Sequence, residues 1–218
     1  MFTRIKNFLH ITVLMNLYSL RNLLTGNGAV WLKLDTSDLE NMAQKTVERS
    51  SLKLNGKNVL DLGCGTGTML SYLHRKEHCI PHGVDLIRLN IHQCRKKMKD
   101  GHFSRQDIIK YLNETKEKFD LVILYGVIGC FTLEDQEIII NKIAKLLNVG
   151  GILWIGANIY TDSVYKFQTY PVPRGFYEKI CTDTSIWALD EFSELEVFGN
   201  GKYDQEQTTV LLTKKVVN

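Results

Sequence analysis

The chain has 218 residues, of which 44% are hydrophobic and 23% charged, and its net charge at pH 7 is +3. These values are ordinary for one globular domain with a substantial core, and the scattered lysines and arginines argue against a nucleic-acid reader, which usually carries a broad basic stripe. The five cysteines are an odd number and include no C-x-x-C pair, so we expect neither a disulfide framework nor a zinc ribbon, and we expect a cytoplasmic protein.

The amino-terminal part of the chain is predicted to contain an amphipathic helix. Its apolar stripe recurs every three or four residues and consists of Phe2, Ile5, Leu9, Val13, Leu17, Leu20 and Leu24. The apolar run 8–17 is too short and too polar to span a bilayer, and no small-residue cleavage site follows it, so we predict neither a transmembrane segment nor a signal peptide. We expect residues 1–50 to form a helical lid segment, with Tyr18 or Trp31 touching a ligand, and residues 51–218 to form the main domain. Simple packing on the core and shallow membrane association are the alternatives.

The most informative segment is VLDLGCGTGT, which extends from Val59 to Thr68. Its first half is apolar, as in a buried strand, and a helical pattern begins at Thr68. Between them, Gly63, Gly65 and Gly67 allow positive φ angles and a close approach to the main chain. The segment therefore predicts a strand that runs into a ligand-binding turn.

Downstream of this turn, short apolar runs alternate with helical periodicity, which indicates βαβ units and a parallel sheet. Further strands are predicted over 80–85, 102–105, 119–127 and 151–155. The run 119–127 is continuously apolar after its aspartate, as in a strand that is buried on both faces. It is therefore expected near the centre of the sheet.

Two of the intervening helices have clear apolar faces. The face of the first consists of Ile87, Ile91, Cys94 and Met98, and that of the second of Ile139, Ile140, Ile143, Leu146 and Leu147. A capping box that starts at Thr132 precedes the second helix, and the glycines at 150–151 follow it. The basic run 95–97 is expected to face solvent on the outer side of the first helix.

The last part of the chain reads differently. Ser193–Phe198 and Thr208–Thr213 are strand-like, and the turn residues 199–201 between them predict an antiparallel hairpin. Before the hairpin, the 27 residues 158–184 show no clear period. Their aromatic residues are Tyr160, Tyr165, Phe167, Tyr170, Phe176 and Tyr177. We expect an irregular loop here that either covers a ligand or packs onto the sheet.

The glycine spacing selects the kind of ligand. The turn reads G-x-G-x-G behind Asp61, whereas the dinucleotide fingerprint reads G-x-G-x-x-G, and a second carboxylate, Asp85, follows about 22 residues after Gly63. This pattern closely resembles the first motifs of the class I S-adenosylmethionine-dependent methyltransferases, from roughly Leu54 to the end of the chain. The resemblance implies an α/β, Rossmann-like fold with a seven-stranded, mostly parallel sheet. It also implies helices on both faces and an antiparallel C-terminal hairpin, whose last strand inserts beside the fifth.

The resemblance also implies S-adenosylmethionine as cofactor and assigns its contacts. Asp61, Gly63, Gly65 and Gly67 would surround the methionine end; Asp85 and Leu86 the ribose; Gln106, Asp107 and Ile108 the adenine; and Tyr125 the wall of the site. The alternative role for Asp107 is a plain helix N-cap. We expect no metal site, because His74, His78, Cys79 and His82 fall across a helix end and a buried strand.

The reaction is left open at two points. No unambiguous general base is found: the candidates Tyr125 and Tyr160 end the fourth and fifth strands, and neither tyrosine is a strong base. The fourth strand lacks the N/D-P-P-Y/F and Pro-Cys sequences of nucleic-acid methylases. Its sequence FDLVILYGVIGC, with the later GGILWIGAN, resembles small methyltransferases of polysaccharide and natural-product biosynthesis.

We therefore expect a small-molecule acceptor, with O-methylation of a sugar or secondary metabolite. An RNA or protein methyltransferase, a non-catalytic binding subunit of the same fold and an NAD-dependent oxidoreductase are the alternatives. The sequence assigns no oligomeric state.

Overall fold

The structure is a computed structural model and describes residues 36–158, 175–184, 186–197 and 206–215. Several predictions from the sequence lie outside these ranges: the amphipathic helix before residue 36 with its lid contacts, the candidate Tyr160, and the hairpin turn at 199–201. No helix in the described ranges is long and apolar enough to cross a membrane.

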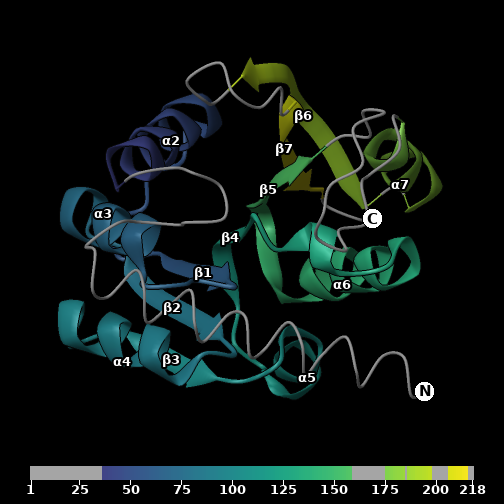
Figure 1. The fold of residues 1–218 in the computed structure, drawn as a ribbon. Helices are drawn as coiled ribbons and strands as arrows, with labels where there is room; N and C mark the ends of the chain where they lie inside the picture. Colours follow the sequence, from purple (N-terminus) through teal and green to yellow (C-terminus); the bar gives the residue numbers. More distant parts are fainter. Residues whose placement is uncertain (1–35, 159–174, 185, 198–205, 216–218) are drawn as a thin grey trace.

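The described residues form a seven-stranded sheet with helices on both faces (Figure 1). The strands are β1 (Asn58–Leu62), β2 (Ile80–Asp85), β3 (His102–Arg105), β4 (Phe119–Tyr125), β5 (Leu147–Asn158), β6 (Trp187–Val197) and β7 (Glu206–Lys214). The helices are α2 (Thr36–Ser50), α3 (Thr68–Glu77), α4 (Arg88–Lys97), α5 (Ile108–Glu114), α6 (Leu133–Leu146) and α7 (Phe176–Thr184), with a 3-10 turn η2 (Ile128–Cys130).

The strand order is β3-β2-β1-β4-β5-β7-β6. Strands β1 to β5 pair in parallel, whereas β7 runs antiparallel to both β5 and β6. The predicted insertion of the last strand beside the fifth is therefore confirmed, as is the mostly parallel α/β sheet. The carboxyl ends of β1, β2, β3 and β4 meet at one edge, where ligands of such sheets bind.

Alternate residues of the central strands face two separate parts of the core. On β4, Val122 and Leu124 pack with α5, α6 and α7, whereas Leu121 and Ile123 pack with α2, α3 and α4. All four side chains are almost completely buried. Because both faces of β4 are covered, its sequence is apolar without alternation, as predicted.

Helix α2 completes the core on the side of α3. Its residues Leu39, Met42 and Ala43 are buried in the cluster that also holds Leu70 and Leu73 of α3. The sequence placed residues 36–50 in a lid segment, and this part of that segment packs against the main domain. The lid itself and the boundary at residue 50 stay predictions.

The structure corrects three predicted elements. The prediction of an irregular loop through residue 184 is wrong, because α7 forms over its last part, and Tyr177 and Ile180 are 2% and 4% exposed in the core. Strand β6 starts at Trp187 rather than Ser193. Strand β5 starts at Leu147, ahead of the glycine pair, so this residue follows α6 instead of ending it.

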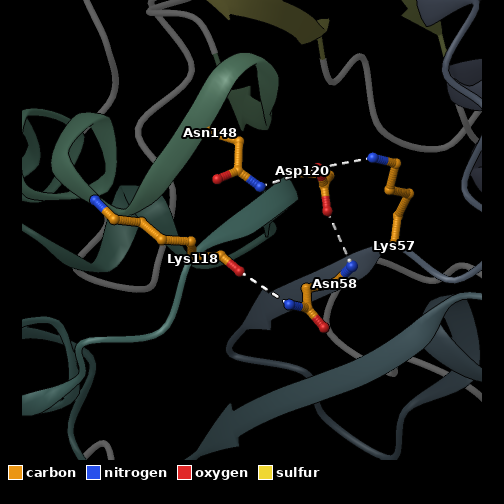
Figure 2. A network of polar contacts seen from close by, with 5 residues as sticks. All are labelled: Lys57, Asn58, Lys118, Asp120 and Asn148. Atoms are coloured by element: carbon orange, nitrogen blue, oxygen red, sulfur yellow. Dashed lines mark hydrogen bonds and ion pairs between the residues drawn. The ribbon is translucent and has the colours of Figure 1, made fainter.

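A polar network joins the starts of three strands at the edge opposite the carboxyl ends (Figure 2). Asp120 accepts hydrogen bonds from the backbone N–H of Asn58 (3.1 Å) and from Nδ2 of Asn148 (3.0 Å), and its Oδ1 lies 3.6 Å from Nζ of Lys57. Nδ2 of Asn58 in turn donates to the backbone O of Lys118 at 3.1 Å. One carboxylate thus ties the amino ends of β1, β4 and β5 together.

Two histidines stack at the same end of the sheet. His82 on β2 is 7% exposed, and its ring lies parallel to that of His102 on β3 with centroids 4.6 Å apart. Nε2 of His82 is 3.3 Å from Oδ1 of Asn58. Burial lowers the pKa of His82 to about 4, and the neighbouring His102 contributes a smaller part of this shift. The ring is therefore neutral in the folded protein over most of the acidic range.

This buried neutral ring predicts a loss of stability in acid. Between about pH 6.5 and 4 the unfolded chain protonates His82 while the folded chain does not, so the free energy of unfolding falls as the pH falls. We expect His82→Gln to reduce this fall in the free energy of unfolding by about 1 to 2 kcal/mol. The effect is moderate because His102, the partner of His82, is exposed, so solvent partly screens the pair. Urea unfolding at several pH values measures it. The exposed His92→Gln is the control, and a His82→Gln profile parallel to wild type would contradict the prediction.

Candidate functional site

The glycine turn leaves the carboxyl end of β1 and leads into α3. The N–H groups of Gly63 and Cys64 both donate to the backbone O of Val84 on β2, at 2.7 and 3.0 Å, which fixes the turn against the neighbouring strand. The φ angles of Gly63, Gly65 and Gly67 are 83°, 53° and 74°, as the predicted turn requires.

Two of these glycines have opposite surroundings. A Cβ on Gly67 would lie 2.8 Å from Sγ of Cys94 and 2.9 Å from Cε of Met98, so the turn is pressed against α4 there. A Cβ on Gly65 would meet no atom of the described residues within 4 Å. The turn is thus packed on one side and open at Gly65, where a ligand can approach the main chain.

Asp85 ends β2 beside this open position. Its Oδ2 accepts from the N–H of Gly65 at 3.0 Å, and its Oδ1 accepts from the N–H of Ile87 at 2.7 Å and from Nδ2 of Asn90 at 3.2 Å. Burial raises the pKa of Asp85, and the hydrogen bonds from Ile87, Gly65 and Asn90 oppose that rise. The carboxyl group is therefore fixed in orientation by donors on both oxygens.

Asp61 lies near Asp85, on the adjoining strand β1, where it pairs with Gly83 of β2. It is 4% exposed, and no hydrogen bond to its carboxyl group comes from the part of the chain that the structure describes. Burial, reinforced by the charge of Asp85, raises the pKa of Asp61 to about 8. A carboxyl group buried without a donor favours a ligand that brings its own, such as an ammonium or a hydroxyl group.

The predicted third motif follows β3. The backbone N–H of Gln106 donates to the backbone O of Asp85 at 3.2 Å, which brings the motif to the same edge of the sheet. Oδ1 of Asp107 accepts from the N–H of Lys110 at 3.0 Å, so Asp107 is the N-cap of α5, the second of its two predicted roles. Ile108 is 6% exposed in the core beside α6. Their contacts with adenine stay predictions.

The remaining predicted residues flank this edge. Leu86 is half-buried, and its backbone O accepts from Nε of Arg105 at 3.2 Å. Tyr125 ends β4 and is 8% exposed, with its ring 5.8 Å from that of Trp154. A Cβ on Gly156 would lie 2.0 Å from the Tyr125 ring, so glycine is required beside it. This packing suits a wall of the site.

Helix α4 also contacts the candidate site, which was not predicted from the sequence. Nζ of Lys97 donates to the backbone O of Thr66 at 2.9 Å, and a guanidinium nitrogen of Arg95 donates to the backbone O of Phe103 at 2.6 Å. The run is exposed to solvent, as expected, and two of its side chains also bond to backbone carbonyls of neighbouring segments. Asn90, Cys94 and Lys97 follow a helical spacing toward the glycine turn, a signal that was present in the sequence.

The clustered histidines and cysteine point in different directions. Nδ1 of His74 bonds to the backbone O of Cys79 (2.9 Å), and its Nε2 faces Asp100 (3.3 Å), whereas His82 stacks on His102. In the described ranges, no group of three or more His, Cys, Asp or Glu side chains is placed to hold a metal ion. All five cysteines are free thiols.

Comparison with known sequences finds similarity to methyltransferases over about half of the chain. A family model described as a methyltransferase domain matches residues 59–151. An uncharacterized protein, RP028, of Rickettsia prowazekii (strain Madrid E) is 31% identical over 110 residues, or 48% of this chain and 44% of that protein. A phthiotriol/phenolphthiotriol dimycocerosates methyltransferase of Mycobacterium ulcerans (strain Agy99) is 30% identical over 125 residues, or 56% of this chain and 42% of that protein. The chain spans less than half the length of these curated relatives.

Comparison with solved structures identifies the fold. The S-adenosylmethionine complex of magnesium protoporphyrin IX methyltransferase from Synechocystis PCC 6803 matches with a TM-score of 0.70 at 15% identity, covering 96% of this chain and 97% of that chain. The similarity extends over nearly the whole of both proteins. The arrangement of strands and helices described above is thus that of a methyltransferase fold.

Proposed function

We propose that this chain is a class I S-adenosylmethionine-dependent methyltransferase and that it methylates a small molecule at a hydroxyl oxygen of a sugar or secondary metabolite. The single observation that carries the proposal is the arrangement at the carboxyl ends of β1 and β2. There the fixed carboxyl group of Asp85 lies beside a glycine turn that is open at Gly65.

The residues present fit this cofactor. The carboxyl group of Asp85 would accept hydrogen bonds from the ribose hydroxyls, because its orientation is already fixed by Gly65 and Ile87. The buried carboxyl group of Asp61 would face the methionine end, whose ammonium group supplies the donor that it lacks. Asp107 keeps one oxygen free of the helix cap for the exocyclic amine of adenine.

The bound cofactor supplies a methyl group on a positively charged sulfur that is itself the leaving group. The chain has to hold that methyl group in line with the acceptor oxygen and to keep water out. Such alignment is worth several kcal/mol in an in-line displacement. Tyr125 would form a wall of the site, since its ring packs beside that of Trp154. Removal of the acceptor proton is assigned to no residue of the described ranges.

The basic side chains near the site favour a small acceptor over a nucleic acid. Lys97, Arg105 and Arg95 each donate to a backbone carbonyl of the domain itself. Each of these side chains thus uses a donor within the domain, and the net charge of +3 is small for a protein that neutralises many phosphates. The Mycobacterium ulcerans relative is named as a methyltransferase of phthiotriol and phenolphthiotriol dimycocerosates, which supports a small-molecule acceptor.

Two measurements test this function. Calorimetry with S-adenosylhomocysteine and with NAD in parallel is expected to show binding of the first alone, and binding of NAD alone would contradict the cofactor. Incubation with S-adenosylmethionine and separate sets of sugars, phenols, transfer RNA and proteins is then followed by release of S-adenosylhomocysteine. Release with a hydroxyl-bearing small molecule supports the proposed acceptor, whereas release with RNA or protein alone would overturn it.

A further inference from the structure

Helix α4 makes a row of contacts with the segments that form the candidate site. The contacting residues are Asn90, Cys94 and Lys97, which stand four and three positions apart and so share one side of the helix. Each reaches a different part of the site, from the end of β2 to the middle of the glycine turn. None of the three was assigned a contact with the cofactor.

The first contact is to the carboxyl group of Asp85. Asn90 is 8% exposed, and its Nδ2 donates to Oδ1 of Asp85 at 3.2 Å. The other two donors to this carboxyl group are backbone N–H groups, of Ile87 and Gly65. Asn90 is therefore the side-chain donor that fixes the plane of the carboxyl group from the helix side.

The other two contacts are to the glycine turn. Sγ of Cys94 lies 3.4 Å from the backbone O of Gly65 and 3.9 Å from Sγ of Cys64. Nζ of Lys97 donates to the backbone O of Thr66 at 2.9 Å. Two consecutive carbonyls of the turn are thus held toward α4, which turns the open side of Gly65 away from the helix.

We propose that Asn90 and Lys97 are positioning residues for the cofactor: Asn90 orients the Asp85 carboxyl group for the two ribose hydroxyls, and Lys97 holds the turn open beside it. The inference rests on the proposed function, because it assumes an adenosyl ligand on Asp85. It goes further in assigning roles to two residues outside the glycine turn and the acidic strand ends. Neither residue touches the ligand itself; both act through the groups that do.

The first test uses Asn90→Leu, which keeps the branched shape of the buried side chain and removes the donor. We expect S-adenosylhomocysteine to bind this variant about 10-fold more weakly, the effect of losing one hydrogen bond to a charged group. The affinity for an analogue that lacks both ribose hydroxyls is expected to fall by less than about 2-fold between wild type and variant, because this analogue forms no hydrogen bonds with Asp85. A merely structural role would weaken both ligands equally, and equal losses, or no loss, would overturn the assignment of Asn90.

The second test uses the exposed helix end, where folding is not at risk. Lys97→Met is expected to weaken S-adenosylhomocysteine binding by about 3-fold, since one exposed hydrogen bond to the turn is lost. Its neighbour Lys96→Met is the matched control and should bind as wild type. Equal affinities of the two variants would overturn the role of Lys97. Failure of the wild-type protein to bind S-adenosylhomocysteine would instead overturn the proposed function, and this inference with it.

Discussion

Asp85→Ala should abolish most of the affinity for S-adenosylhomocysteine. The substitution removes the acceptor at the carboxyl end of β2 and leaves the N–H groups of Gly65 and Ile87 without their partner. Loss of a charged acceptor costs about 2 to 4 kcal/mol of binding free energy, which corresponds to a roughly 30- to 1,000-fold larger dissociation constant. Isothermal titration of the purified variant against wild type measures this change.

A second variant separates binding from local folding. Asp85→Asn keeps one carbonyl oxygen to accept from the turn but loses the charge, so its affinity should lie between those of wild type and the alanine variant. Asp100→Ala removes a 71% exposed carboxylate outside the site and should bind as wild type. If Asp85→Ala bound the ligand normally, the end of β2 would not be the ribose site.

Gly67→Ala should have the largest effect on stability in the turn. At φ 74° an alanine would adopt a left-handed conformation, and its Cβ would press on Cys94 and Met98 at 2.8 and 2.9 Å. Together, the backbone conformation and the overpacking should lower the free energy of unfolding by about 2 to 4 kcal/mol. For a chain of this size that corresponds to a melting temperature lower by about 5 to 15 °C, which calorimetry or circular dichroism can measure.

Gly65→Ala is the matched comparison, because Gly65 has a left-handed φ of 53° but its Cβ would have no neighbour within 4 Å in the part of the chain that the structure describes. It should cost only about 1 kcal/mol of stability. Its methyl group would, however, occupy the open side of the turn, so we expect more than about 10-fold weaker binding of S-adenosylhomocysteine. Normal binding by Gly65→Ala would show that the ligand lies elsewhere.

The parallel half of the sheet was predictable because its signals are local. Strands β2 and β3 have the bounds that the sequence predicts. The capping box is also confirmed, since Oγ1 of Thr132 accepts from the N–H of Asp135 at 3.2 Å. Each of these features depends on residues that are neighbours in the sequence.

The features that were missed depend on contacts between distant segments. Helix α7 is short and contains β-branched residues, and the spacing of Tyr177, Ile180 and Cys181 was its one helical signal. The shared helical spacing of Asn90 and Lys97 was visible in the sequence, but their partners were not. Asn90 meets the carboxyl group of Asp85, 5 positions away, and Lys97 meets the backbone carbonyl of Thr66, 31 positions away.

The place of β7 between β5 and β6 also governs how the protein can be assembled during translation. Strand β5 has no neighbour on one side until residues 206–214 have left the ribosome, because β6 pairs with β7 and not with β5. A nascent chain that stalls earlier therefore exposes a free backbone edge, which is a template for aggregation. The glycine turn, Asp85 and α4 are all synthesised long before, so the ligand-binding half can form while that edge still needs chaperone protection.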